Sequence, residues 1–227
     1  MTIGIPREIK PSEYRVSLPP SSVLELVMAG HEVVVEAEAG AGSGFTDLEY
    51  LEAGARIASA EACWAAGLVV KVKEPLPSEY RYFRKDMILF TYLHLAAVSG
   101  LADEIRKSGM TAVAYEMVQL DDGSLPLLAP MSEVAGRIGA VMAAALLLKH
   151  NGGRGLIPGG VPGVGRARFV IVGAGVAGSA AVQYAVGMGA DVTVLDVSLP
   201  RLRFLEELYE SRITTLHSNR RNLARAV

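Results

Sequence analysis

The sequence predicts an α/β protein in which parallel strands are covered by helices on both faces. Short apolar segments rich in β-branched residues alternate along the chain with helix-like segments. Glycine is frequent, at 24 of 227 residues, and much of it falls in clusters that separate these segments. Hydrophobic residues make up 51% of the chain and charged residues 20%, which is enough apolar material for a core.

Four strands are predicted in the first part of the chain, at Thr2–Ile5, His31–Glu36, Leu68–Val72 and Met87–Tyr92. Ser21–Ala29 is predicted as a helix because it has helical periodicity and is followed by Gly30. Thr46 and Glu49 have the spacing of a capping box, which predicts a short helix ended by Gly54. This alternation of strands and helices defines the first predicted domain.

A long helix is predicted after this first domain, which covers residues 1–131. Ser132 is a suitable N-cap, and Glu133–His150 is rich in alanine and apolar almost all round. We therefore expect this helix to be buried on most sides, either as a core helix or as a connection between domains. Residues 132–165 are predicted as an inter-domain helix with a glycine-rich linker, and residues 166–227 as the first half of a second domain.

The second domain begins with a glycine motif between a strand and a helix. The apolar strand Arg168–Val172 leads directly into Gly173-Ala-Gly-Val-Ala-Gly178. Gly173 permits the tight turn, Gly175 allows a pyrophosphate to approach the backbone, and Gly178 lets helix pack on strand. The helix N-terminus then favours phosphates. We predict a dinucleotide site here, and a tight strand–helix junction without a ligand is the alternative.

Asp196 ends the next predicted strand, about 20 residues after the first glycine of the motif. A carboxylate at this position accepts hydrogen bonds from the ribose hydroxyls of the adenosine and repels a 2′-phosphate, which favours NAD over NADP. Arg201 and Arg203 lie close enough in the sequence to weaken that preference. The predicted cofactor contacts in this domain are Gly173, Gly175, Val176, Ala177, Gly178, Asp196 and Arg201.

Cationic or titratable residues follow three predicted strands of the first domain. Lys71 and Lys73 occupy alternate positions at a strand end, so we expect both ammonium groups on one face, unless they simply reach solvent. Arg15 follows the loop after the first strand and His94 follows the next apolar strand; a surface arginine and a structural histidine are the alternatives. Because ligands bind at the carboxyl ends of parallel strands, the set suits a small anionic substrate such as a carboxylate.

Charge and composition exclude several classes of protein. The 22 Lys and Arg residues nearly balance the 24 Asp and Glu residues, unlike in a typical nucleic-acid-binding domain. The single cysteine, Cys63, excludes an internal disulfide framework and fits a reducing compartment. Charge near Met1 comes too early for a signal peptide, and the longest apolar run, Ile138–Leu148, is shorter than the ~20 residues that span a bilayer. We expect a cytoplasmic protein with no nucleic-acid or membrane partner.

These segments jointly resemble the alanine dehydrogenase family, which also includes the NAD(H)-binding subunit of proton-translocating transhydrogenase. The matching stretches run in order along the chain: Gly4–Glu8, Glu13–Val16, Val70–Pro75, Leu89–Ala96, Leu127–Arg137, Gly159–Gly163 and the glycine motif with Asp196. Val70–Pro75, Leu89–Ala96 and Gly159–Gly163 resemble the dehydrogenase branch more than the transhydrogenase branch. The resemblance implies two Rossmann-like doubly wound domains.

The resemblance also implies a reaction and roles for particular residues. The reaction is the reversible, NAD-dependent deamination of L-alanine to pyruvate and ammonia, with hydride transfer from Cα to the nicotinamide. Arg15 and Lys73 would hold the substrate carboxylate and carbonyl, and His94 would act as acid–base. Ser132 would contact the cofactor near the hinge. A homohexamer is the implied assembly.

The second domain is expected to be incomplete. Chains of this family continue past the equivalent of residue 227 and carry a catalytic aspartate in that further part. Here a predicted strand at Ile213–Leu216 is followed only by a helix start, whereas a doubly wound nucleotide domain has a second half. Three hypotheses follow: a dehydrogenase that is active in a longer natural form, a transhydrogenase subunit that docks to a membrane partner, and an inactive NAD-binding fragment.

Overall fold

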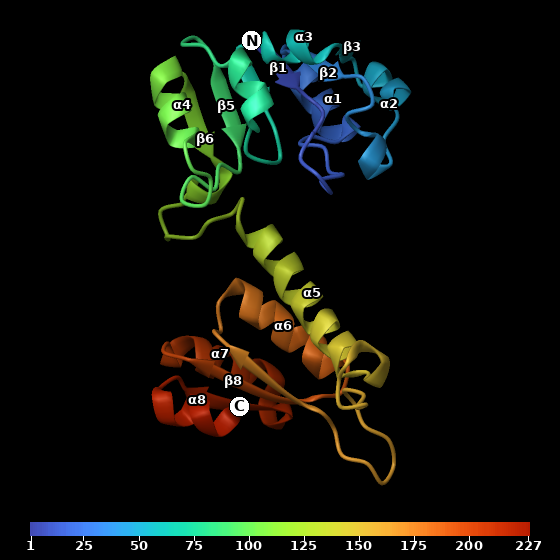
Figure 1. Cartoon of the computed structure of the whole chain (residues 1–227), viewed down its shortest axis with the longest axis vertical. Coiled ribbons are helices and arrows are strands. Elements are labelled where there is room, and N and C mark those ends of the chain that lie inside the picture. Colours follow the sequence, from blue (N-terminus) through green and yellow to red (C-terminus); the bar gives the residue numbers. More distant parts are fainter. The chain divides into compact units, whose positions relative to one another are not determined.

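The computed structural model describes residues 1–227, which form two compact units, Met1–Leu125 and Pro126–Val227 (Figure 1). Each unit has its own parallel sheet and its own buried core. This confirms the predicted α/β class with two Rossmann-like domains. The boundary falls before the long helix, so the residues we assigned to a separate linker, 132–165, belong to the second unit.

The first unit contains a six-stranded parallel sheet with the order β3-β2-β1-β4-β5-β6. Its strands are β1 (Thr2–Ile5), β2 (Glu32–Glu36), β3 (Arg56–Ala58), β4 (Leu68–Val70), β5 (Ile88–Thr91) and β6 (Thr111–Ala114). The direction of the strand order reverses between β1 and β4, as in a doubly wound sheet. Ligands of such sheets bind beyond the carboxyl ends of the strands at this reversal.

Helices cover both faces of this sheet. They are α1 (Pro20–Met28), α2 (Asp47–Glu52), α3 (Ala60–Trp64) and α4 (Leu101–Ser108), with short 3₁₀ helices η1 (Ala41–Ser43), η2 (Pro77–Tyr82) and η3 (Tyr115–Met117). Ile3 and Ile5 of β1 share a buried cluster with Val23 of α1. Gly4 faces the other way, where a Cβ would lie 1.9 Å from the carbonyl oxygen of Cys63 in α3. Glycine at this position therefore allows α3 to pack closely on the sheet.

In this unit, sequence patterns predicted the longer helices and strands more accurately than the shorter ones. The capping box of α2 is present: Thr46 Oγ1 accepts the Glu49 N–H at 3.3 Å, and the Glu49 carboxylate accepts the Thr46 N–H at 2.6 Å. Two strands, β3 and β6, and one helix, α4, were not predicted. β3 has only three residues and α4 buries only Leu101, so neither has a strong apolar pattern.

The second unit contains three parallel strands in the order β7-β8-β9, one half of the doubly wound order. They are β7 (Arg168–Val172), β8 (Asp191–Asp196) and β9 (Ile213–His217), and the helices are α5 (Ala129–Leu147), α6 (Val176–Gly187), α7 (Leu199–Tyr209) and α8 (Arg220–Ala226), with η4 (Lys149–Asn151) and η5 (Glu210–Arg212). Val182 of α6 and Leu205 of α7 are buried against Val192 of β8. Leu147 of α5 packs against the same cluster, which makes α5 part of this unit.

Helix α5 differs from its prediction at its start and in its burial. It begins at Ala129, because Pro130 fits the first turn of a helix, and Ser132 lies inside it rather than at the N-cap. Only Gly136 and Ala140 are buried. The expectation of a helix buried on most sides is wrong for this chain, since large apolar residues are exposed along α5: Val134, Ile138, Val141, Met142 and Leu146.

By length and composition alone, α5 is the one helix that could cross a membrane, with 19 residues and a mean hydropathy of 1.2. A single helix of this kind is weak evidence for a membrane span, because core helices of soluble proteins can have the same length and composition. Charged residues interrupt its first half, where Arg137 pairs with Glu133 at 3.4 Å. Gly136 brings α5 against α6: a Cβ there would lie 2.0 Å from the carbonyl oxygen of Ala177.

Gly136→Ala should destabilise the second unit, because its methyl group would overlap the backbone of α6. Overpacking of this kind typically costs about 1–3 kcal/mol. Gly139→Ala in the same helix is the matched control, since a Cβ at Gly139 meets nothing within 4 Å and alanine favours a helix by about 1 kcal/mol over glycine. Urea unfolding measures both free energies. Equal stability of the two variants would contradict close packing of α5 on α6.

Candidate active site

The predicted substrate residues of the first unit follow three strands that are neighbours in its sheet. Arg15 lies in the segment after β1, Lys73 follows β4, and His94 follows β5. β4 pairs with β1 on one side and with β5 on the other, so these segments leave the same edge of the sheet. We call Arg15, Lys73 and His94 the cationic edge. It lies at the reversal of strand order, where doubly wound sheets bind ligands.

Arg15 is held by a neighbouring carboxylate. Its Nε donates to Glu13 Oε1 at 2.7 Å and one terminal nitrogen donates to Glu13 Oε2 at 2.5 Å, which gives the parallel pair of bonds typical of strong arginine–carboxylate contacts. The hydrogen bond from Arg15 lowers the pKa of Glu13, and the charge of Lys73 acts in the same direction. Arg15 and Lys73 therefore act on one ionised carboxylate. Both Glu13 and Arg15 line a cavity of ≈ 290 Å³.

The shared face expected for Lys71 and Lys73 depended on a strand that continues to Val72, and the structure ends this strand earlier. β4 ends at Val70, so the alternation of faces no longer applies at Lys71. The Lys71 side chain is only 1% exposed, and its Nζ lies 3.2 Å from Glu8 Oε2 and 2.9 Å from Glu79 Oε1. Lys71 is thus the centre of a buried ionic cluster (Glu8, Lys71 and Glu79).

Glu8 connects this cluster to the cationic edge. Its Oε1 accepts the backbone N–H groups of Val72 at 2.6 Å and Lys73 at 3.3 Å. Burial raises the pKa of Glu8, and the nearby charge of Lys71 opposes that rise. Glu8 therefore fixes the backbone that carries Lys73. Sequence reasoning did not single out Glu8, although a charged residue just after a buried strand was a usable signal.

His94 has an unusual backbone conformation and a stacked ring. Its φ of 46° lies in the left-handed region, which few residues other than glycine adopt. The imidazole stacks on Tyr92, with centroids 5.9 Å apart and planes 12° apart. Burial raises the pKa of Tyr92, and the charge of Arg15 opposes this. Tyr92 is therefore a shared neighbour of Arg15 and His94, and it was not among the predicted residues.

The glycine motif of the second unit has the geometry of a phosphate-binding turn. Gly173 has a φ of 103°, which strains any other residue. A Cβ on Gly178 would lie 1.8 Å from the carbonyl oxygen of Gly173, so α6 could not pack as closely on the turn. A Cβ on Gly175 would meet nothing within 4 Å, so there is open space next to the backbone at the N-terminus of α6. These features fit a dinucleotide pyrophosphate.

Asp196 lies beside this turn as the last residue of β8. Its Oδ2 accepts the Ala174 N–H at 2.5 Å and its Oδ1 accepts the Ser198 N–H at 2.6 Å. These bonds, the one from Ala174 first, lower the pKa of Asp196 and keep it ionised. Since each carboxylate oxygen can accept more than one bond, the group can still accept ribose hydroxyls.

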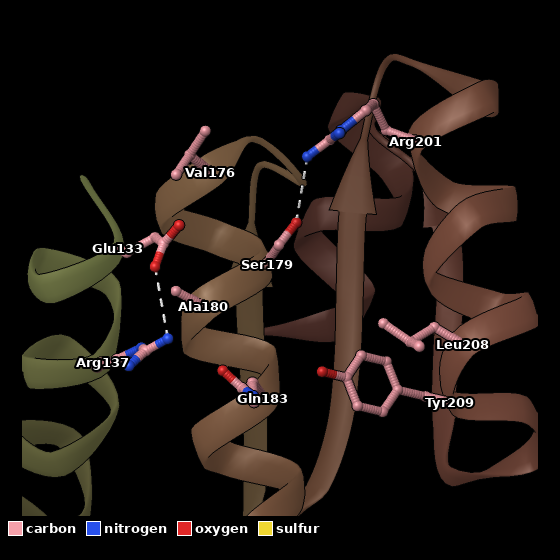
Figure 2. Close-up of a pocket in the computed structure, with 9 residues that line it drawn as sticks. All are labelled: Glu133, Arg137, Val176, Ser179, Ala180, Gln183, Arg201, Leu208 and Tyr209. Carbon is pink, nitrogen blue, oxygen red and sulfur yellow. Dashed lines mark hydrogen bonds and ion pairs between the residues drawn. The ribbon is translucent and has the colours of Figure 1, made fainter. Parts of the chain in front are cut away.

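Arg201 of α7 reaches the same turn. Its Nε donates to the carbonyl oxygen of Ala174 at 2.9 Å. A terminal nitrogen donates to Ser179 Oγ at 3.3 Å, and Figure 2 shows this second bond. Arg201 thus supports the turn, and its direct contact with a cofactor stays a prediction. A cavity of ≈ 350 Å³ lies alongside, between α5, α6 and α7, with Glu133 and Val176 in its wall. Ser132 immediately precedes Glu133 in α5.

A doubly wound fold with a glycine-rich strand–helix turn in one unit and a cationic edge in the other is typical of nucleotide-dependent dehydrogenases. The chain belongs to the alanine dehydrogenase/PNT family. The N-terminal domain of that family matches residues 4–135, and its C-terminal domain matches residues 139–227.

Named relatives agree with this assignment. The chain is 52% identical over 229 residues to an alanine dehydrogenase of Geobacillus stearothermophilus, matching all of this chain and 62% of that protein. A solved L-alanine dehydrogenase structure matches with a TM-score of 0.94 and 50% identity, over 100% of this chain and 63% of that one. A transhydrogenase structure from Sinorhizobium meliloti matches less closely, with a TM-score of 0.78 and 28% identity over 95% and 64% of the two chains. The chain therefore spans less than two thirds of these relatives' length.

Lys71→Met should destabilise the first unit, because Glu8 and Glu79 would lose the buried cation that they share. Leaving buried charges unpaired typically costs about 3–5 kcal/mol. Without Lys71 the pKa of Glu8, already raised by burial, would rise further. A carboxyl group whose pKa is higher in the folded than in the unfolded state stabilises the folded protein at pH values below its unfolded-state pKa. This stabilisation is lost as the pH rises through the folded-state pKa.

The loss of stability in Lys71→Met should therefore be greater at pH 8 than at pH 5 when measured by urea unfolding. Lys107→Met is the matched control, because it removes an exposed ion pair with Glu104 and should have little effect at either pH. If the two variants lost the same stability, the buried ionic cluster would not be important for folding.

Proposed function

We propose that the protein is an NAD-dependent alanine dehydrogenase, which converts L-alanine reversibly to pyruvate and ammonia with hydride transfer from Cα to the nicotinamide. The observation that supports the proposal is that Arg15, Lys73 and His94 follow three neighbouring strands, at the edge where doubly wound sheets bind ligands. The sequence similarity to alanine dehydrogenases supports the same reaction.

In this proposal the cationic edge binds and polarises the substrate. A small carboxylate pairs with Arg15, whose guanidinium is oriented by Glu13. Lys73 directs its positive charge at the carbonyl or imine and stabilises negative charge that develops on it. Arginine suits the carboxylate because its planar donor fork matches two oxygens, and lysine suits a single atom because it is a point charge.

His94 exchanges protons with the substrate in this proposal. Imidazole is the side chain best suited to act as both acid and base near neutral pH. The ring is exposed and stacked on Tyr92, so it is accessible from solvent while one face is covered. Deamination requires a proton to leave and return at nitrogen or oxygen, and His94 is the histidine of the cationic edge.

We propose NAD as the cofactor, held by the glycine motif, Val176, Ala177, Asp196 and Arg201, with Ser132 of α5 contacting it near the hinge. When bound, NAD supplies the acceptor for the hydride. The ionised Asp196 carboxylate disfavours a 2′-phosphate, which supports NAD over NADP. The open backbone at Gly175 leaves room for the pyrophosphate.

We propose a cytoplasmic homo-oligomer, a hexamer by family resemblance, that acts on small molecules without nucleic-acid or membrane partners. The exposed apolar side chains of α5, from Val134 to Leu146, support an assembly because a further copy of the chain could cover them. Size measurement by sedimentation tests the assembly. A monomer at micromolar concentration would remove this part of the proposal.

The competing function is the NAD(H)-binding subunit of a transhydrogenase. Purified natural-length protein should reduce NAD in the presence of L-alanine without membranes, followed by the absorbance of NADH. A transhydrogenase subunit would leave alanine unoxidised and exchange hydride between NAD(H) and NADP(H) only with its membrane partners. The identity of 52% to an alanine dehydrogenase, against 28% to a transhydrogenase structure, favours the first outcome.

Asp196→Ala should weaken NAD binding more than NADP binding. The carboxylate would no longer accept the ribose hydroxyls, at about 1.5–3 kcal/mol for a hydrogen bond to a charged group. It would also no longer repel the 2′-phosphate. Calorimetric titration of both cofactors measures the effect, with Asp191→Ala at the exposed start of β8 as control. Tighter binding of NADP than NAD by the unsubstituted protein would overturn the cofactor assignment.

His94→Gln should lower kcat about 100-fold or more, because general acid–base groups contribute about 10²–10⁴-fold. Glutamine preserves much of the side chain's size and hydrogen bonding but does not titrate. The melting temperature and the NAD affinity should stay close to those of the unsubstituted protein. A variant that keeps most of its turnover, or that unfolds, would identify His94 as a structural residue.

A further inference from the structure

We propose that Glu116 is a positioning residue for His94, holding the backbone of the histidine in the conformation that presents its ring at the cationic edge. The inference rests on the proposed acid–base role of His94. Glu116 comes from a different strand connection and was not among the residues predicted from the sequence. Its carboxylate accepts the backbone amides of residues 93 and 94, so its proposed action is on the backbone of His94.

The end of the β5–β6 ladder explains why a side chain is needed here. The last paired residues are Thr91 and Ala114. Beyond Ala114 the chain turns into η3, so β6 offers no further carbonyl oxygens to the residues that follow β5. N–H groups shielded from water and left without an acceptor are costly, and the Leu93 amide lies in a partly buried position. A carboxylate placed on η3 can replace the missing carbonyls.

Glu116 occupies this position and accepts both amides. Its Oε1 lies 3.1 Å from the Leu93 nitrogen and 2.8 Å from the His94 nitrogen, and its Oε2 lies 3.3 Å from the Leu93 nitrogen. Hydrogen bonds to a charged acceptor are stronger than those between neutral groups. One half-buried carboxylate thus holds two consecutive peptide groups.

The conformation of His94 is one that requires such support. Its φ of 46° is strained for an L-residue, and strained backbone persists only where surrounding contacts maintain it. Leu93, a residue that is only 3% exposed, anchors the chain just before it. The His94 carbonyl oxygen accepts the Ala97 N–H at 2.8 Å just after it. The amide of His94 itself is held by Glu116. If this bond were lost, the φ angle of His94 could relax, and the imidazole would rotate away from Tyr92.

The first test measures the backbone directly and needs no activity. In the 227-residue chain, hydrogen exchange of the Leu93 and His94 amides should be about 10-fold faster in Glu116→Ala, as expected when a bond worth about 1–1.5 kcal/mol is lost. The NMR coupling constant that depends on the φ angle of His94 should also change in Glu116→Ala. Glu116→Gln keeps an Oε1 acceptor and should preserve both values. Glu49→Ala is the matched control, because it removes a carboxylate that accepts the N–H of Thr46, the N-cap residue of α2.

The second test uses the natural-length protein and separates positioning from a merely structural role. Glu116→Ala should lower kcat by up to about 100-fold, the effect of misplacing a reacting group by about 1 Å, while KM for pyruvate and the affinity for NAD change little. Glu116→Gln should restore most of kcat. Glu49→Ala should leave kcat unchanged.

Three results would overturn the inference: unchanged amide exchange in Glu116→Ala, an unchanged kcat in that variant, or a loss in Glu116→Gln as large as in Glu116→Ala. Failure of the proposed function is seen separately, because the unsubstituted protein would then fail to oxidise alanine. In that case the exchange and coupling measurements alone decide whether Glu116 holds the backbone of His94.

Discussion

The buried ion pairs of Lys71 with Glu8 and Glu79 are the interaction on which the first unit's candidate site depends. Lys71 is almost fully inaccessible, so two carboxylates near it are needed to compensate its charge. The same Glu8 carboxylate accepts the amides of Val72 and Lys73. The cluster therefore joins the segment after β1 to the segment after β4, and it determines where the backbone of Lys73 lies.

Both candidate sites use backbone amides at the carboxyl ends of parallel strands. In the first unit the carboxylates of Glu8 and Glu116 accept amides just beyond β4 and β5. In the second unit Asp196 accepts the amide of Ala174 just beyond β7. The hydrogen bonding between neighbouring strands ends at these points, and acidic side chains accept the amides in place of backbone carbonyl oxygens. As a result each segment that carries a proposed functional group is held in a defined conformation.

Several features of the fold and site were accessible from sequence patterns, and others were not. The apolar strand before Gly173 and the glycine spacing predicted a turn that the structure contains at the expected residues. The alternation of faces does not apply at Lys71, since it holds only while the chain remains in a strand and β4 ends one residue earlier. The burial of α5 was also overestimated, because a helix's apolar composition does not identify the surface that covers it.

The sequence by itself determined the α/β class, the glycine turn with Asp196 and the three residues of the cationic edge. These depend on local periodicity, on residues that alone tolerate a given backbone conformation, and on family motifs that keep their order. Only the tertiary structure decided that Lys71 is buried, that Glu13 accepts hydrogen bonds from Arg15, and that Glu116 accepts the amide of His94. Glu13 lies only two residues from Arg15, but Glu8 and Glu116 lie far from their partners in sequence. Strand order brings those partners together, and strand order is set by long-range packing rather than by local pattern.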